Sequence, residues 1–186
     1  MAKYGVTCFQ CFTLEQVKEI NKEIKKNIVG KEPAVYTAAD ASKTGTFIHV
    51  HCGSIMELIH PWLYRCQLIN KSIFGYDVYW HFHLDTLHYN VYGVEGKYGW
   101  HIDAGMKDAD ESDITVSDIK LTCLLNLSEE TYEGGEFHTI NDSSEKHNFT
   151  PGMGLIINPL IAHQVTPVTK GERITLTYWA SGPAWK

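Results

Sequence analysis

Apolar residues recur at helical spacing near the start of the chain. Thr13 and Gln16 form a capping box, and Gly30 marks the expected end of the helix. The apolar stripe between them consists of Leu14, Val17, Ile20, Ile24 and Ile28. The pattern therefore predicts an amphipathic helix over residues 13–30.

A second helix is predicted after residue 53. Ser54 and Glu57 form another capping box, and Pro61 is expected to kink or restart the helix behind it. The apolar stripe of this helix consists of Ile55, Leu58, Ile59, Leu63, Cys66 and Ile69. Residues 31–45, between the two helices, are expected to form a polar loop.

From Gly75 onward the apolar spacing becomes two residues, which is typical of strands. Alternation is clearest over residues 76–82. Further short strands are expected at 86–92, 98–103, 119–127, 135–140, 144–149, 153–158, 162–168 and 172–180. Helices followed by many short strands predict an α+β, mainly β fold, with a helical layer packed on a β-sandwich or jelly roll.

Composition and charge exclude several classes of function. The 186 residues are 44% hydrophobic and 20% charged, which suits one globular domain. Sixteen basic and 22 acidic residues give a net charge of −6, which argues against a nucleic-acid or membrane-surface binder. No apolar run approaches the roughly 18 residues of a transmembrane helix, and we expect no signal peptide. The sequence predicts no oligomeric state.

The cysteines indicate a reducing compartment, because their number is five and their spacing is not that of a disulfide framework. We therefore expect a cytoplasmic protein, or one in the host cytoplasm if a phage encodes it. Cys8 and Cys11 form a C-x-x-C, which could be half of a zinc site or a redox pair. Without a second such pair, two small apolar residues are the favoured interpretation.

Two H-x-D triplets are candidate metal ligands. Residues i and i+2 of a strand point to the same face, so either His83 with Asp85 or His101 with Asp103 could chelate one ion. The first triplet continues an alternating strand and is more simply read as a half-exposed face. The second follows a glycine- and aromatic-rich stretch, residues 92–100, and precedes a polar segment, where active sites often lie.

The last third of the chain offers partners for this triplet. His163 follows a predicted buried strand, and Arg173 opens another. Arg173, Thr175, Thr177 and Trp179 share one face of that strand. A buried arginine is costly unless an anion meets it, and a dicarboxylate ligand is one such anion. In isolation, Arg173 could equally be an edge-strand arginine paired with a surface acid.

In this order, the motifs resemble those of the Fe(II)- and 2-oxoglutarate-dependent dioxygenases, in particular the prolyl 4-hydroxylase-like branch with its PKHD-type hydroxylases. The resemblance spans about residues 75–182. It is carried by Tyr92, Gly96, Tyr98, His101 and Asp103, by the strand Leu121–Ser128, by Gly134-Gly135-Glu136-Phe137, by Pro151 to Leu155, by His163-Gln164-Val165 and by Arg173.

The resemblance implies a double-stranded β-helix, a cupin-like jelly roll, in a single domain over residues 1–186. Residues 1–74 would form a helical support and residues 75–182 the jelly-roll core. His101, Asp103 and His163 would bind Fe(II). Arg173 would bind the distal carboxylate of 2-oxoglutarate, helped by a hydroxyl of Tyr92, Thr175 or Thr177. O₂ is the further cosubstrate that the resemblance implies, and ascorbate is a candidate additional cofactor.

One position departs from the family pattern. Animal relatives carry a tyrosine in the strand after H-x-D that also contacts this carboxylate, and the corresponding place here is near Asn126. The second polar partner of Arg173 is therefore left open.

The expected reaction is hydroxylation of an unactivated C–H bond with release of succinate and CO₂, most simply on a prolyl residue of a peptide or protein. The alternatives are the same chemistry on a free amino acid or other small metabolite, and a metal-binding jelly roll without turnover. Tyr79, Trp80, Tyr89 and Trp100 could line a proline-binding groove, although aromatics at strand spacing are more often core residues.

An acidic segment follows Asp103 directly. Residues 104–118 contain five acids and are long for a strand connection, so we expect a lid that orders over a substrate peptide with basic flanking residues. An ordinary solvated loop is the alternative interpretation.

Overall fold

Antiparallel strands dominate the computed structural model, which describes residues 5–28, 33–35, 43–82, 85–103, 117–140 and 147–185. The strands are β1 (Val6–Gln10), β2 (Ala34–Val35), β3 (Lys43–Thr44), β4 (Thr46–His51), β5 (Thr86–Tyr92), β6 (Lys97–His101), β7 (Ser117–Asn126), β8 (Glu133–Gly134), β9 (Phe137–Thr139), β10 (Met153–Ile157), β11 (His163–Val165), β12 (Val168–Lys170) and β13 (Arg173–Pro183). The helices are α1 (Leu14–Asn27) and α2 (Met56–Ile69), with a 3₁₀ turn η2 (Cys52–Ser54) and a π-helical turn η3 (Asn70–Phe74).

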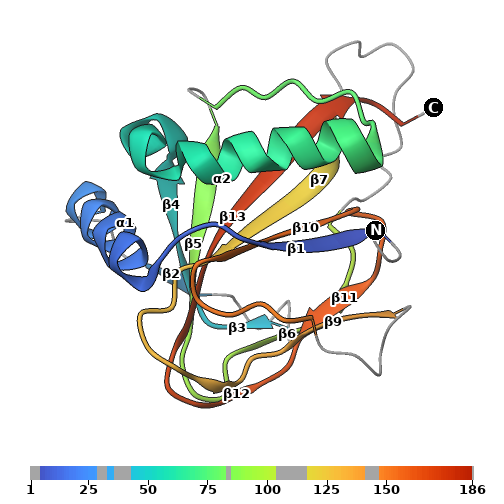
Figure 1. The fold of residues 1–186 in the computed structure, drawn as a ribbon. Coiled ribbons are helices and arrows are strands. Elements are labelled where there is room, and N and C mark those ends of the chain that lie inside the picture. The colour runs from blue at the N-terminus through green and yellow to red at the C-terminus, as the bar shows by residue number, and fades with distance from the viewer. Residues whose placement is uncertain are drawn as a thin grey trace.

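Strands far apart in the sequence are neighbours in both main sheets. The large sheet has the order β1-β10-β7-β13-β5-β4-β2, and the smaller one has the order β3-β6-β11-β9 (Figure 1). A short pair, β12-β8, completes the strands of the described residues. This crossed-over pairing confirms the predicted double-stranded β-helix, or jelly roll.

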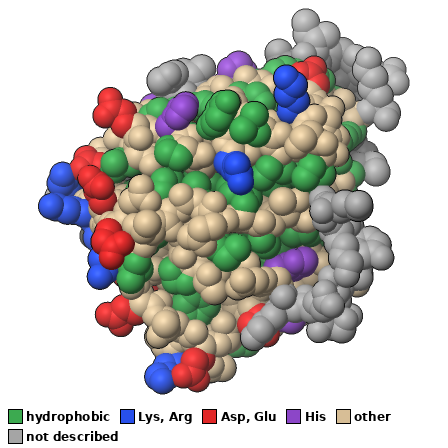
Figure 2. Space-filling model, viewed as in Figure 1, with side chains coloured by type: hydrophobic (Ala, Val, Ile, Leu, Met, Phe, Trp, Pro, Cys, Tyr) green, Lys and Arg blue, Asp and Glu red, His purple; other side chains and the backbone are tan. Residues whose placement is uncertain are grey.

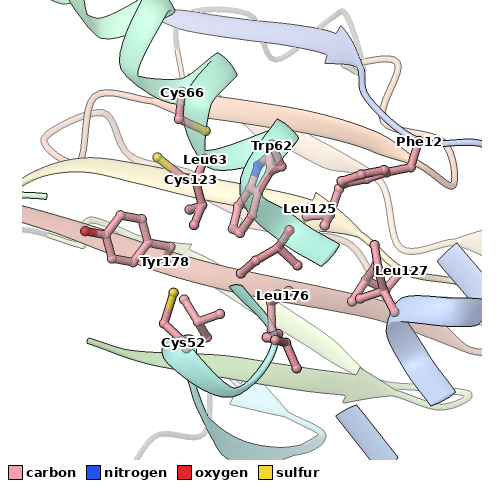
Figure 3. Packing of buried hydrophobic residues seen from close by; sticks show 14 of the residues in the cluster. Phe12, Cys52, Trp62, Leu63, Cys66, Cys123, Leu125, Leu127, Leu176 and Tyr178 are labelled. Carbon is pink, nitrogen blue, oxygen red and sulfur yellow. The ribbon is translucent and has the colours of Figure 1, made fainter. Parts of the chain in front are cut away.

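The helices cover one face of the large sheet, as predicted (Figure 1). Buried residues of α1 and α2 join those of β7 and β13 in the main hydrophobic core. In Figure 3, Trp62, Leu63 and Cys66 of α2 point toward residues of the sheet such as Cys123 and Leu125. Burial of this apolar area is the main force that holds the helical layer on the sheet.

The opposite face of the large sheet looks toward the smaller sheet. Along β13, Ile174, Leu176, Tyr178 and Ala180 belong to the helix-side core. Arg173, Thr175, Thr177 and Trp179 alternate with them and line a pocket between the sheets. The predicted division of this strand into two faces is therefore confirmed. A second apolar cluster, which includes Leu124, Phe137, Leu155 and Val165, fills part of the space between the sheets.

The capping box of α1 forms as predicted. The backbone N–H of Gln16 donates to the side chain of Thr13, and the side chain of Gln16 accepts from the N–H of Thr13. The outer face of α1 is charged, and Figure 2 shows acidic and basic side chains gathered along the edge of the molecule where α1 lies. One of its ion pairs links Lys25 to Glu129, which follows β7.

The capping box predicted for the second helix is wrong. Ser54 lies in the 3₁₀ turn η2, and its hydroxyl donates to the carbonyl of His51 instead of capping a helix. Helix α2 starts two residues later without a side-chain cap, and it continues through Pro61. Pro61 is the sixth residue of α2, past the unpaired N–H groups of the first turn, so it removes one i→i−4 backbone hydrogen bond without ending the helix.

The strand predicted over residues 76–82 is also wrong. Burial alternates there as expected, with Tyr76, Val78, Trp80 and Phe82 packed against the main core. The segment nevertheless forms no ladder among the described residues, and one backbone bond, from Tyr79 N–H to the Ser181 carbonyl, links it to the sheet. Trp80 adopts a positive φ of 51°, which is incompatible with a continuous strand.

Other differences lie at the edges of the sheets. Strands β1 and β4, and the short β2 and β3, were not predicted, and residues 147–149 of the predicted strand 144–149 are not in a strand. Residues 1–74 therefore supply sheet strands as well as helices, so residue 74 does not divide a helical region from a β region. That the chain is a single domain stays a prediction.

Two predictions fall on residues outside the described ranges. Most of the expected lid, residues 104–116, lies there, and so does His83 of the alternative metal triplet. Within the described ranges, no helix is both long and apolar enough to cross a membrane. The cytoplasmic location stays a prediction.

Candidate active site

His101, Asp103 and His163 come together where β6 and β11 pair. His101 ends β6, His163 begins β11, and the two residues are direct partners in the antiparallel register. Asp103 follows β6 and is held by a bond from its N–H to the Pro159 carbonyl, at 3.0 Å. One potential ligand atom from each of the three side chains lies within 4.8 Å of the others. Among the described residues, no other group of three or more His, Cys, Asp or Glu side chains meets this criterion.

Both histidine rings are oriented by backbone carbonyl groups. His101 Nδ1 lies 2.8 Å from the Gly99 carbonyl oxygen, and His163 Nδ1 lies 2.9 Å from that of Ile161. A neutral ring that donates from Nδ1 leaves the lone pair of Nε2 free. Each Nε2 lies 3.5 Å from an oxygen of Asp103, so two nitrogen atoms and a carboxylate converge on one point. Metal-binding histidines are commonly oriented in this way, by a hydrogen bond from the ring nitrogen that does not bind the metal.

Asp103 is ready to act as an anionic ligand. Burial would raise the pKa of its carboxyl, but the hydrogen bond from His101, the charge of His163 and the hydrogen bond from Thr122 together hold that pKa below its usual range. Thr122 Oγ1 donates to Asp103 Oδ2 over 2.6 Å from the neighbouring large sheet. The carboxylate is thus fixed from both sheets at once.

Asp85, the described residue of the alternative triplet, does not line this pocket. Asp85 Oδ2 accepts a hydrogen bond of 2.8 Å from the hydroxyl of Tyr178, a residue of the helix-side core. Asp85 therefore belongs to the other side of the large sheet. Cys8 and Cys11 do not join any metal-ligand group of the described residues, and burial raises the pKa of each thiol to about 11. That shift suits two small apolar residues better than ligands or redox groups.

Arg173 lies in the same pocket, and 1% of its surface is exposed. No described residue accepts a hydrogen bond from its Nε or Nη2. Its guanidinium carbon lies 5.4 Å from the ring centre of Tyr92 and 5.7 Å from that of Phe149. A Cβ atom at Gly135 would lie 2.9 Å from Arg173 Cδ, so a larger residue there would crowd the side chain. A buried guanidinium with two unpartnered nitrogen atoms requires an anion.

The other residues predicted around Arg173 are also in this pocket. Tyr92, Thr175 and Thr177 line it, and Thr177 Oγ1 accepts a hydrogen bond of 3.1 Å from Asn90 Nδ2. Burial raises the pKa of Tyr92 in spite of the nearby charge of Arg173, so its hydroxyl stays protonated at neutral pH.

Asn126 cannot replace the tyrosine of animal relatives, because its side chain is already engaged. Its Nδ2 donates to the hydroxyl of Tyr132 and to the Phe149 carbonyl, and its Oδ1 accepts from the N–H of Ser128. Asn126 thus stabilises the wall behind Arg173, and the remaining partners for an anion there are hydroxyl groups of the pocket.

Several contacts of the site were not predicted from the sequence. Thr122 contacts Asp103, while Tyr98 and Phe137 stack on the rings of His101 and His163 with centroids 3.4 and 5.2 Å apart. Lys43, in the expected polar loop, holds its ammonium 4.0 Å above the ring centre of Tyr98. Except for the contact of Tyr98 with His101 within β6, these contacts join strands that are far apart in the sequence, so no local pattern reports them. Strand alternation could have flagged Thr122, which faces away from Leu121 and Cys123.

Comparison with known proteins agrees with the family resemblance of the sequence motifs. Residues 87–181 match the model of the 2OG-Fe(II) oxygenase superfamily, and this segment contains His101, Asp103, His163 and Arg173. A PKHD-type hydroxylase of Stenotrophomonas maltophilia is 37% identical over 93 residues, which are 49% of this chain and 40% of that protein. The chain therefore matches less than half of the length of this curated relative.

Solved structures resemble the whole fold. A prolyl-4-hydroxylase of Pseudomonas putida superposes with a TM-score of 0.71 and 18% identity, over 98% of this chain and 95% of that one. The viral collagen prolyl hydroxylase of Paramecium bursaria Chlorella virus-1, in its 2OG complex, gives a TM-score of 0.70 and 17% identity, over 97% of both chains. At these identities the likeness shows the fold alone.

Proposed function

The chain belongs to the 2OG-Fe(II) oxygenase superfamily, and we propose that it is a 2-oxoglutarate-dependent dioxygenase that hydroxylates a C–H bond of its substrate. The observation that carries this proposal is one pocket that joins the His101–Asp103–His163 group to the buried, unpartnered Arg173. The first can hold a metal ion and the second an anion, and the superfamily uses such a pair together.

His101, Asp103 and His163 would hold Fe(II). Their donor set, two imidazole nitrogen atoms and one carboxylate, is that of the facial triad of non-haem iron oxygenases. Fe(II) and 2-oxoglutarate, when bound together, would supply the oxidising power for O₂-dependent hydroxylation, with succinate and CO₂ as by-products. The protein contributes the geometry, because the Gly99 and Ile161 carbonyls and Thr122 fix all three ligands.

Arg173 would bind the distal carboxylate of 2-oxoglutarate. Its two free nitrogen atoms suit a bidentate contact, and burial strengthens that contact because little water competes. Thr175, Thr177 and Tyr92 line the same pocket and can donate hydroxyl hydrogen bonds to the carboxylate. No ascorbate site is suggested by these residues, so that cofactor stays a prediction.

For the substrate, we propose a prolyl residue of a peptide or protein. The support is the hydroxylase name of the curated relative and the prolyl hydroxylase names of the structural neighbours, which describe those proteins. The predicted aromatic groove has little support, since Trp80 and Tyr89 pack in the helix-side core, and the Tyr89 hydroxyl binds Asn21 there. The aromatic residues that line the pocket are Tyr92, Tyr98, Phe137 and Trp179, and none of them belongs to the predicted groove.

The proposal is tested by turnover of the Fe(II)-loaded protein with 2-oxoglutarate and O₂. Succinate would be measured without a prime substrate, with proline-containing peptides, and with free amino acids. Mass spectrometry of each product would detect the addition of one oxygen atom. We expect succinate in all Fe(II)-containing samples and hydroxylation of a prolyl peptide. Hydroxylation of free amino acids alone would replace the peptide proposal with the small-molecule alternative. Absence of succinate under every condition would refute the dioxygenase proposal.

A further inference from the structure

Two histidines outside the proposed iron site face each other on neighbouring strands. His49 of β4 and His88 of β5 are direct partners in the antiparallel register. His88 lies two residues before Asn90, on the face of β5 that lines the pocket. Its ring stacks on Phe47, with centroids 5.1 Å apart, and meets the ring of Trp179 edge-on at 4.6 Å. Because Trp179 lines the pocket, this histidine pair lies at the pocket's border.

The two rings converge on a common point. Their Nε2 atoms are 2.9 Å apart, their centroids are 4.4 Å apart, and their planes are tilted by 53°. Two imidazoles bound at a right angle to one metal, with N–metal bonds of about 2.0–2.1 Å, have nitrogen atoms about 2.9 Å apart and centroids about 4.5 Å apart. An in-line N–H···N hydrogen bond of the same length would set the centroids about 5.2 Å apart. The observed geometry fits two ligands of one ion better than an in-line hydrogen bond.

The proposed iron ligands provide an internal comparison. The rings of His101 and His163 have centroids 4.2 Å apart and planes tilted by 58°. The pair of His49 and His88 differs from them by 0.2 Å and 5° (4.4 − 4.2 and 58 − 53). Both pairs are cross-strand partners in an antiparallel ladder. The same two-imidazole arrangement therefore occurs twice in this chain.

The local environment keeps the second pair available to a cation. Burial, the charge of His49 on β4 and that of Lys43 on β3 lower the pKa of His88 to about 4, so its ring is neutral at pH 7. His88 Nδ1 is buried without a described hydrogen-bond partner, and Nε2 is the ring nitrogen that faces His49. His49 is exposed, so an ion can enter from solvent. The nearby Lys43 charge opposes a cation, so this site should bind more weakly than the three-ligand site.

We propose that His49 and His88 form a second metal site, which binds a divalent transition-metal ion through two imidazole nitrogen atoms. The remaining coordination positions would be filled by water. With two nitrogen ligands, the affinity should follow the order Cu(II), then Ni(II) and Zn(II). This inference goes beyond the proposed function, because it does not depend on the iron site or on turnover.

The experiment counts bound Ni(II) by equilibrium dialysis and elemental analysis at pH 7.5. The unmodified protein should bind two equivalents and His49→Ala one. His101→Ala should retain the equivalent at the second site. His60→Ala, which removes an exposed histidine of α2, is the matched control and should bind as the unmodified protein does. His88→Gln is a second test, and circular dichroism with a thermal midpoint confirms that each variant is folded.

Cu(II) electron paramagnetic resonance identifies the ligands. In His101→Ala, the Cu(II) signal should show nitrogen couplings from two imidazoles, and His49→Ala added to this variant should remove that signal. Binding of a single equivalent by the unmodified protein would overturn the proposal. So would two equivalents in both His49→Ala and His88→Gln, because the second ion would then have other ligands.

Discussion

Each of the three proposed iron ligands should be needed individually. Replacing His101, Asp103 or His163 with alanine leaves two ligands, so we expect loss of Fe(II) at this site and of 2-oxoglutarate turnover. Iron content after anaerobic reconstitution with one equivalent, together with succinate formation, measures both. The control is the double variant His83→Ala with Asp85→Ala, which should keep iron even though it loses the bond from Tyr178 to Asp85. Iron lost by this control but kept by His101→Ala would mean that the other triplet is the metal site.

Arg173 should determine affinity for the cosubstrate but not for iron. Arg173→Leu is expected to raise the 2-oxoglutarate requirement by two to three orders of magnitude or more, because losing one partner of a buried charge pair costs about 3–5 kcal/mol. Thr177→Val should cost less, about 1.5–3 kcal/mol, the value of a hydrogen bond to a charged group. Titration of succinate formation against 2-oxoglutarate compares the two. An unchanged requirement in Arg173→Leu would exclude the arginine from the site.

Thr122 should matter for the metal although it is not a ligand. Its hydroxyl fixes the Asp103 carboxylate, and loss of a hydrogen bond that orients a metal ligand typically reduces metal affinity about 10–100-fold. We expect Thr122→Val to bind Fe(II) more weakly by that factor in a competition titration with a chelator. Thr7→Val is the matched control, because Thr7 Oγ1 has no hydrogen-bond partner among the described residues. Equal loss of affinity in both variants would point to a general effect on the fold.

At the scale of elements, the two predicted capping boxes give opposite expectations. Thr13→Ala removes a formed cap of α1 and should lower the free energy of unfolding by about 1 kcal/mol. Ser54→Ala removes an exposed bond to the His51 carbonyl and should change it by less than about 0.5 kcal/mol. Chemical denaturation of both variants measures the difference. A larger loss of unfolding free energy for Ser54→Ala than for Thr13→Ala would mean that Ser54 does cap the second helix.

Elements with a strong local signal were the ones predicted correctly. Helix α1 has both a cap and an apolar stripe, and along β13 apolar core residues alternate with residues that line the pocket. Residues 76–82 show the same alternation but form no strand, because periodicity reports which side chains are buried and not whether a neighbouring strand accepts the backbone. Strands β1 and β4 were missed for the converse reason, since their pairing with β10 and β5 lies far away in the sequence.

At the scale of the whole molecule, the site depends on contacts between the two sheets. His101 and His163 meet because β6 and β11 pair, and Thr122 reaches Asp103 from the large sheet. Spacing alone left two H-x-D triplets open, and the ordered motifs of the family distinguished them. Neither source predicted the position of Lys43, the stacking of Phe137 on His163, or the pair of His49 and His88, because all three follow from tertiary packing.

The most direct test of the dioxygenase proposal is succinate formation from 2-oxoglutarate by the protein loaded with one equivalent of Fe(II), compared with Asp103→Ala and Arg173→Leu. The account predicts O₂-dependent succinate from the unmodified protein. It predicts none from Asp103→Ala, and a rate for Arg173→Leu that recovers only at far higher 2-oxoglutarate concentrations. Equal succinate formation by all three proteins would contradict it, because turnover would then need neither the proposed iron ligand nor the proposed carboxylate partner.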